Sequence, residues 1–242
     1  MTKAENMNFL SHLEELRWSL LRIICVNMFL MVISFFYSNQ IQTLLTAPIT
    51  DSGLTNFYLQ DIKITSPFTA KVIISLFSSF IISFPYIIFE IYKFIYPAIS
   101  KISKLFIFFV FLLSVIFFIV GCLFGYYYLL PVSISFFIRL IDTEVTFAPE
   151  RVSYIFYSFW LILVCGFIYQ LPIISLILTK LRIINYEFLK QMRSYSVIIF
   201  LILGALLSPP DPLSQMLIAL PLYVLYELSI LISYFFREKK DG

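Results

Sequence analysis

Hydrophobic residues occur along this chain in long runs that short polar segments separate. A helix needs about 20 apolar residues to cross a hydrocarbon layer of roughly 30 Å. Six runs are candidates for such helices, at about 18–37, 71–95, 105–130, 152–179, 195–207 and 213–236. The pattern predicts an all-α, polytopic membrane protein with six transmembrane helices in a single domain over residues 1–242.

The first run follows a short charged segment, as the apolar region of a cleavable signal peptide does. It is longer than such a region, and it ends in Tyr37-Ser38-Asn39-Gln40 without a small-residue cleavage site. We expect this run to be retained as a membrane anchor.

Basic residues are distributed unequally between the two sides of the predicted spans. Cytoplasmic loops of membrane proteins are enriched in Lys and Arg. With the N-terminus inside, only four of the 17 basic residues fall on the outer side, namely Lys63, Lys71, Arg139 and Arg151. The charges therefore predict that both termini lie in the cytoplasm.

The loops on the two sides also differ in length. The inner connections are short, whereas the outer segments 38–70 and 131–151 are long enough to form structured caps. Residues 41–45 and 132–137 within them are amphipathic, which predicts short helices that lie at the membrane surface.

The fifth span is unusually short. Residues 196–207 would extend only about 18 Å at 1.5 Å per residue, which is less than the hydrocarbon thickness. The turn Ser208-Pro209-Pro210-Asp211-Pro212 that follows is rigid, because each proline fixes φ. The pattern favours a short hairpin that thins the bilayer or leans on neighbouring helices. The alternative is a helix that extends back through Met192 and Arg193, with the charge at the interface.

Composition excludes several classes of protein. The chain is 61% hydrophobic and 13% charged, with a mean hydropathy of +0.95, which excludes a water-soluble domain. Cys25, Cys122 and Cys165 lie in apolar stretches and are interpreted as small buried hydrophobic residues, and His12 has no neighbouring ligand. No nucleophile-base pair or Gly-rich phosphate loop is present. We expect no catalytic residue, metal site, cofactor or nucleic-acid partner.

Polar residues inside apolar spans are candidates for function, because an ionised group at mid-bilayer costs at least about 2.5–3.5 kcal/mol. Gln170 lies in the middle of the fourth span, Glu227 lies in the last span and Glu90 lies near the inner end of the second. A structural interpretation also exists: Gln170 bonds to a neighbouring helix, and Glu90 reaches cytoplasmic water.

The N-terminal segment 9–17 predicts the start of a helix, with Ser11 as the cap and Glu14 completing a capping box. Glu15 then lies at the cytoplasmic boundary beside Arg17. A carboxylate at the edge of the lipid is a suitable receptor for a basic peptide, because partial desolvation strengthens its hydrogen bonds to guanidinium. The alternative is that Glu15 only solvates the end of the helix.

Several motifs, in the right order along nearly the whole chain, resemble those of the TatC family. Phe9-Leu10-Ser11-His12-Leu13-Glu14-Glu15-Leu16-Arg17 is similar to the family's N-terminal hLxELR signature. The other matching segments are 47–48, 65–68, 84–85, 94–98, 207–215 and 219–227.

The resemblance implies a six-helix, glove-like receptor whose last two helices are short. Such receptors work with single-span partners of the TatA and TatB type and export folded proteins that carry twin-arginine signal peptides, using the proton-motive force. The implied location is the bacterial cytoplasmic (inner) membrane, or a thylakoid or mitochondrial inner membrane. A homo-oligomer within the receptor complex is expected.

The resemblance also implies roles for individual residues. Signal-peptide binding is expected at the inner surface, at Glu15, Phe94, Arg17, Glu14 and Ser103. Contact with partner subunits is expected at Ser208, Gln215, Ala205 and Gln170, and the shape of loops and concave face is expected to depend on Pro48, Pro85, Asp211 and Glu227.

Two positions depart from the family pattern. Ser103 stands where family members commonly have a second Glu that shares the arginine pair, and Gln170 stands where many have Glu. Our hypothesis is that Glu15, together with Glu14, carries recognition. Gln170 still donates a hydrogen bond of roughly 1 kcal/mol to a partner helix, but it cannot carry a proton.

The competing function is a small secondary transporter or channel in which Gln170, Glu227 and proline-broken helices line a solute path. Such proteins often contain paired inverted repeats, and the two halves of this chain show no repeat. An intramembrane enzyme would need a catalytic set that the spans do not carry.

Overall fold

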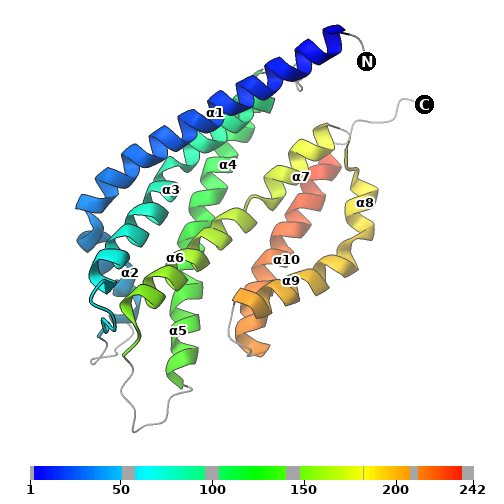
Figure 1. Cartoon of the computed structure of the whole chain (residues 1–242). Helices are drawn as coiled ribbons and strands as arrows, with labels where there is room; N and C mark the ends of the chain where they lie inside the picture. Colours follow the sequence, from blue (N-terminus) through cyan, green and yellow to red (C-terminus); the bar gives the residue numbers. More distant parts are fainter. Residues whose placement is uncertain are drawn as a thin grey trace.

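The structure of this chain, a computed structural model, describes residues 3–50, 58–95, 104–139, 148–181, 183–207 and 212–235. These ranges are almost entirely helical, which confirms the all-α prediction (Figure 1). The helices are α1 Lys3–Phe36, α2 Ser38–Thr50, α3 Ser66–Ile95, α4 Lys104–Phe124, α5 Leu130–Arg139, α6 Arg151–Ile168, α7 Leu171–Lys180, α8 Tyr186–Gln191, α9 Arg193–Leu207 and α10 Pro212–Phe235, with a π-helix η2 at Gly125–Leu129.

Five stretches of the described residues are long and apolar enough to cross a bilayer. They are Leu13–Phe36, Ser66–Phe94, Lys104–Ile138, Arg151–Lys180 and Ile218–Phe235, and they correspond in position to the predicted first four spans and the predicted sixth. The predicted fifth span corresponds to a shorter apolar stretch in α9, Arg193–Ala205.

Helix α9 is short, as the sequence predicts, but it begins earlier than predicted. It has 15 residues, which gives about 22 Å at 1.5 Å per residue. It starts at Arg193, so the helix includes this charge, as in the alternative interpretation, but it does not continue through Met192. A turn at Met192 separates it from α8. The length is still below the roughly 30 Å of a hydrocarbon core.

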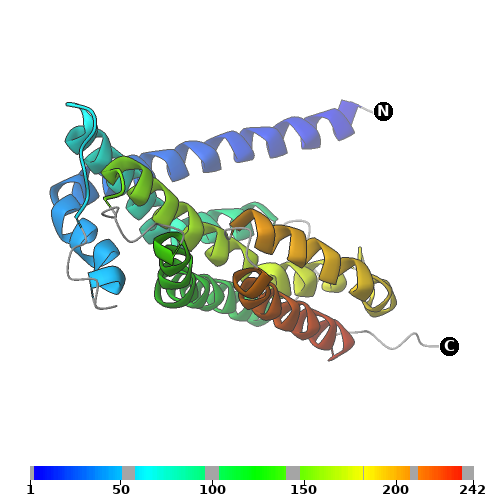
Figure 2. The ribbon, with the colours of Figure 1, turned by 90° about the horizontal axis from the view of Figure 1, so that it is seen from below.

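The helices form two groups around α6. Helix α1 packs along α3, and α3 and α4 pack on α6, whereas α10 packs on α9 and α7. Figure 1 shows that the start of α1 and the end of α10 lie at the same end of the molecule. Seen from below, α1 and α10 lie on opposite sides, with α6 between them (Figure 2).

Two glycines allow α4 and α6 to pack in close contact. A Cβ atom on Gly121 would lie 2.8 Å from the backbone oxygen of Cys165, and one on Gly166 would lie 2.7 Å from the ring of Phe118. Small residues let helix backbones approach closely in lipid, where packing rather than the hydrophobic effect drives association. The core around this contact therefore depends on the absence of two side chains.

The cysteines differ in their surroundings. Cys165 is buried and Cys122 is half-buried, in agreement with the prediction. Cys25 is exposed on α1, so the prediction of a buried side chain is wrong at this position. The reason is that most of α1 contacts only α3, and the rest of its apolar surface is left for lipid to cover.

Pro48 explains how helix α2 is attached to the bundle. Proline has no N–H, so Pro48 leaves the carbonyl of Leu44, four residues earlier, without its helical donor. The Tyr126 hydroxyl donates to this carbonyl oxygen at 2.6 Å. The Tyr154 hydroxyl donates to the next carbonyl, that of Leu45, at 2.9 Å. A proline thus frees an acceptor, and side chains from η2 and α6 bind the freed end of α2.

We expect Tyr126→Phe to lower the free energy of unfolding by about 1 kcal/mol, because the freed Leu44 carbonyl loses its donor. In a Pro48→Ala background the effect should be smaller, since an alanine at this position supplies the missing backbone N–H. A double-mutant cycle on thermal unfolding in detergent measures this difference. Strictly additive effects would contradict the assignment.

The second predicted outer helix is present, but it does not lie apart from the spans. Residues 132–137 fall within α5, which continues α4 through the π-helix η2 without a break. The two segments predicted to lie on the outer side meet through backbone hydrogen bonds on both sides of Gln60, to Pro149 and Arg151, each 3.0 Å long. An ion pair between Arg151 and Asp61, also 3.0 Å, reinforces this contact.

The predicted helix start at Ser11 is wrong. Helix α1 begins at Lys3, so Ser11 and Glu14 lie inside the helix rather than at its first turn. Residues 4–10 contain no proline or glycine that would stop a helix, and several of them are good helix formers. The capping signature therefore identified a helix but not its first residue.

Candidate functional site

The interface between α1 and α3, two apolar helices, contains several polar contacts. Asn27 of α1 donates to the Ser83 hydroxyl at 3.0 Å and accepts from the Ser79 hydroxyl at 2.9 Å. In lipid such interhelical hydrogen bonds contribute about 0.6 kcal/mol on average. They fix the register of α1 against α3.

Nearer the start of α1, a two-point ion pair joins the same helices. The Arg22 guanidinium donates through Nε to Glu90 Oε1 at 3.0 Å and through Nη2 to Oε2 at 2.9 Å. Tyr86 adds a hydrogen bond to Oε1 at 2.9 Å, and Arg22 Nη2 also donates to the Ser19 hydroxyl at 2.9 Å. Bidentate pairs of this kind are strong and fix orientation as well as distance.

This pair was not foreseen from the sequence. Glu90 is only 3% exposed, so the interpretation that it reaches cytoplasmic water is wrong. A signal was available, because Arg22 and Glu90 are opposite charges inside two predicted spans near the same end. Charged groups inside membrane spans pair with one another.

The register set by these contacts places two of the predicted recognition residues at a similar level. The helices run antiparallel, with Asn27 opposite Ser79 and Ser83 and with Arg22 opposite Glu90. Two further turns toward the start of α1 bring Glu15 to the level of Phe94 near the end of α3.

Exposure separates the predicted recognition residues. Glu15 and Phe94 are both half-buried, whereas Glu14 and Arg17 are exposed. Ser103 lies outside the described residues. Glu15 shares a helix face with Ser19 and Arg22, since residues four and seven apart align on an α-helix. A half-buried carboxylate near the end of a span can accept hydrogen bonds from a cationic group at the surface.

Gln170 lies where α6 meets α7 and is 7% exposed. Its Oε1 accepts from the Ser114 hydroxyl at 2.5 Å, and its Nε2 donates to the Ser114 carbonyl at 3.1 Å. The amide therefore bonds to a neighbouring helix, α4, which is the structural interpretation given for it above.

The hairpin of α9 and α10 is held by its own polar contacts. Gln215 Nε2 donates to the Leu201 carbonyl of α9 at 2.8 Å, which leaves its amide oxygen for another donor. At the other end, Arg193 pairs with Glu227 at 2.6 Å, and the Tyr223 hydroxyl donates to the same carboxylate at 2.9 Å. Ala205 is exposed. Ser208 and Asp211 lie outside the described residues.

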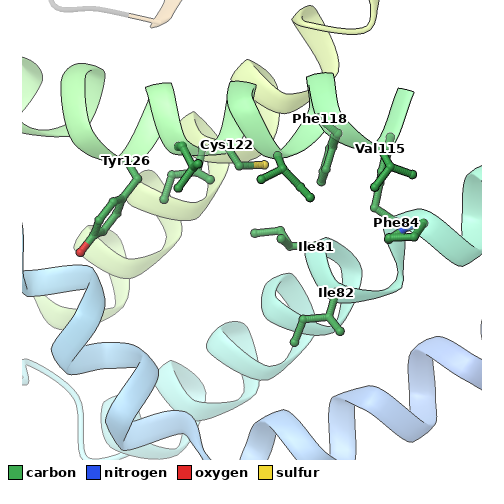
Figure 3. Close-up of a pocket in the computed structure, with 11 residues that line it drawn as sticks. Ile81, Ile82, Phe84, Val115, Phe118, Cys122 and Tyr126 are labelled. Carbon is green, nitrogen blue, oxygen red and sulfur yellow. The ribbon is translucent and has the colours of Figure 1, made fainter. Parts of the chain in front are cut away.

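Pro85 lies at an apolar cavity of about 420 Å³ between α3, α4 and α6 (Figure 3). Phe84, which precedes it, stacks on Phe118 with ring centroids 3.5 Å apart. Cys122 and Tyr126 are the most polar residues of the lining, which carries no charged side chain. This cavity suits an apolar chain and does not provide a path for a polar solute.

Long apolar helices joined by intramembrane polar contacts define this chain as a multi-pass membrane protein. A family model described as "Sec-independent protein translocase protein (TatC)" matches residues 11–221. The chain belongs to this family.

Relatives and solved structures agree with this assignment. The Sec-independent protein translocase protein TatC of Rickettsia prowazekii is 33% identical over 238 residues, which cover 96% of this chain and 95% of that protein. The TatC of Aquifex aeolicus is 32% identical, with 97% and 98% covered. A crystal structure of the twin-arginine translocase receptor TatC superposes with a TM-score of 0.79 at 31% identity, covering 93% of this chain and 98% of that one.

Proposed function

We propose that this chain is the core receptor subunit of a twin-arginine protein translocase. It binds the paired arginines of a signal peptide at the cytoplasmic face. Together with single-span subunits of the TatA and TatB type, it exports folded proteins with the proton-motive force. The observation that carries this proposal is the position of Glu15, a half-buried carboxylate that the register of α1 and α3 brings to the level of Phe94.

Glu15 supplies the charge and Phe94 an apolar surface for the peptide. Glu14 and Arg17 are exposed beside them, and Glu14 adds a second, weaker attraction for a basic peptide. At position 103 the family commonly has a carboxylate, and Ser103 offers only a hydroxyl. Recognition in this chain therefore depends more strongly on Glu15 than it would if a second carboxylate shared the arginine pair.

The topology in this proposal has six crossings with both termini in the cytoplasm, α9 being the additional crossing. The start of α1 and the end of α10 lie at one end of the molecule, which supports an even number of crossings (Figure 1). The short α9 is accommodated by local thinning of the bilayer. The membrane is the bacterial cytoplasmic membrane, or the equivalent organellar inner or thylakoid membrane.

Partner subunits dock on the hairpin of α9 and α10 in this proposal, and receptor subunits associate with one another in the complex. Exposed Ala205 and the amide oxygen of Gln215 support a mixed apolar and polar contact there. Such contacts suit single-span helices, because one interhelical hydrogen bond adds up to about 1–2 kcal/mol in lipid.

Site-specific photocrosslinking tests the location of the receptor site. Leu13 and Phe36 are both exposed and lie at opposite ends of the apolar stretch of α1, so a photoreactive residue at each gives a matched pair. A precursor with a twin-arginine signal peptide, added from the cytoplasmic side of membrane vesicles, should crosslink at position 13 and not at position 36. Crosslinking at position 36 alone would contradict the proposal.

A further inference from the structure

Arg22 presents a problem for any recognition of arginine by Glu15. Both side chains lie on the same face of α1, seven residues apart, which is two helical turns or about 10.5 Å along the axis. Side chains on a helix lean toward its N-terminus, so the Arg22 guanidinium is directed toward Glu15. Its hydrogen bond to Ser19, one turn earlier, shows this direction.

The protein therefore carries its own guanidinium close to the carboxylate that would bind the guanidinium groups of a signal peptide. Opposite charges at this separation attract each other, and the attraction is screened less at the edge of the lipid than in water. The geometry that prevents a direct pair is the fork of two hydrogen bonds from Arg22 to Glu90 on α3.

We propose that Glu90 determines the specificity of the signal-peptide site by sequestering Arg22, an inference that rests on the proposed function. Glu90 holds the guanidinium at two points, and Tyr86 orients the carboxylate that holds it. Glu15 is then left available for an arginine from outside the chain. Glu90 is a positioning residue here, because it acts on the peptide only through Arg22 and Glu15.

The two single neutral variants of the pair should have different effects on peptide binding, although both break the same ion pair. In Glu90→Gln the charge of Arg22 is no longer balanced, and it competes with the peptide for Glu15. In Arg22→Gln the competitor is gone. A merely structural pair would give an equal loss from either side or a larger loss from Arg22→Gln, which leaves the buried Glu90 carboxylate unpaired. A larger loss from Glu90→Gln therefore distinguishes the two roles.

The measurement is the dissociation constant of a fluorescent twin-arginine signal peptide for the full chain in lipid nanodiscs. Glu90→Gln should weaken binding at least about tenfold, which corresponds to one charge-assisted hydrogen bond. Arg22→Gln and the double variant should stay within about threefold of the wild type. Asp61→Asn is the matched control, because it also neutralises the acidic partner of an arginine, but at the outer end of the molecule.

A second variant tests competition without disturbing the pair. Trp18 is 54% exposed and lies three residues from Glu15, so Trp18→Arg places an unpaired guanidinium one turn away from it. Trp18→Arg should weaken binding of the peptide at least about tenfold relative to Trp18→Gln, which corresponds to the loss of one charge-assisted hydrogen bond.

The outcomes separate this inference from the proposed function. If Glu15→Gln binds the peptide as well as the wild type does, the proposed recognition site is wrong. If Glu15→Gln loses binding but Glu90→Gln and Arg22→Gln weaken it equally, or if Trp18→Arg binds like Trp18→Gln, sequestration of Arg22 is overturned and the site stands.

Discussion

Glu15→Lys is expected to abolish export of a folded reporter that carries a twin-arginine signal peptide. The substitution removes the half-buried acceptor and places a positive charge where the peptide brings two more. Removing one partner of a desolvated charge pair costs about 2–5 kcal/mol, or roughly 30-fold or more in affinity. Export is measured as the fraction of the reporter that reaches the outer side of the membrane.

The matched control makes the same charge change elsewhere. Glu187 is an exposed carboxylate in the first turn of α8, far along the chain from α1. Glu187→Lys should export the reporter at close to the wild-type level. Wild-type export by Glu15→Lys, or an equal loss from both variants, would show that Glu15 has no special role.

Gly121→Leu should produce the largest loss of stability. The nearest atoms to an added Cβ are the backbone oxygen of Cys165 at 2.8 Å and the Cα of Gly166 at 2.9 Å, and backbone cannot move aside as a flexible side chain can. Overpacking in a core costs typically 1–3 kcal/mol. We expect at least about 3 kcal/mol here, because α4 and α6 must separate along their contact.

The stability of Gly121→Leu is measured as the thermal unfolding midpoint of the purified protein in detergent. Val120→Leu is the control: it changes the neighbouring residue of α4, which is 47% exposed, and should shift the free energy of unfolding by less than about 0.5 kcal/mol. An unchanged midpoint for Gly121→Leu would mean that the close contact of the two helices is not required.

The apolar runs predict most of the helical architecture, because the thickness of a bilayer sets a length that is easily found in a sequence. The short helix α9, the predicted fifth span, was also predictable, since prolines limit it on one side and charges on the other. Its exact start was not, because Arg193 is accommodated through Glu227, a contact between residues 34 positions apart.

The polar contacts of the candidate site were only partly predictable. Glu15 and Phe94 were identified by motif, and their role in recognition stays a prediction. The pairing of Arg22 with Glu90 was missed, because the two residues are 68 positions apart and the sequence does not give the register between α1 and α3.

The role of Pro48 illustrates the same limit. Its presence in a motif identified it as important. That it has no backbone N–H follows directly from its being a proline. The hydroxyl that binds the freed Leu44 carbonyl comes from Tyr126, on a π-helix 82 positions later. Only the folded chain shows which side chain replaces the missing donor.

The central claim is that Glu15 binds the paired arginines of a signal peptide directly. A double-mutant cycle of binding constants tests it, with wild-type and Glu15→Gln protein in nanodiscs against peptides that carry either Arg-Arg or Ala-Ala at the paired positions. We predict that the arginines strengthen binding by roughly 30-fold or more in the wild type and only slightly in Glu15→Gln. The same gain from the arginines in both proteins would contradict the claim.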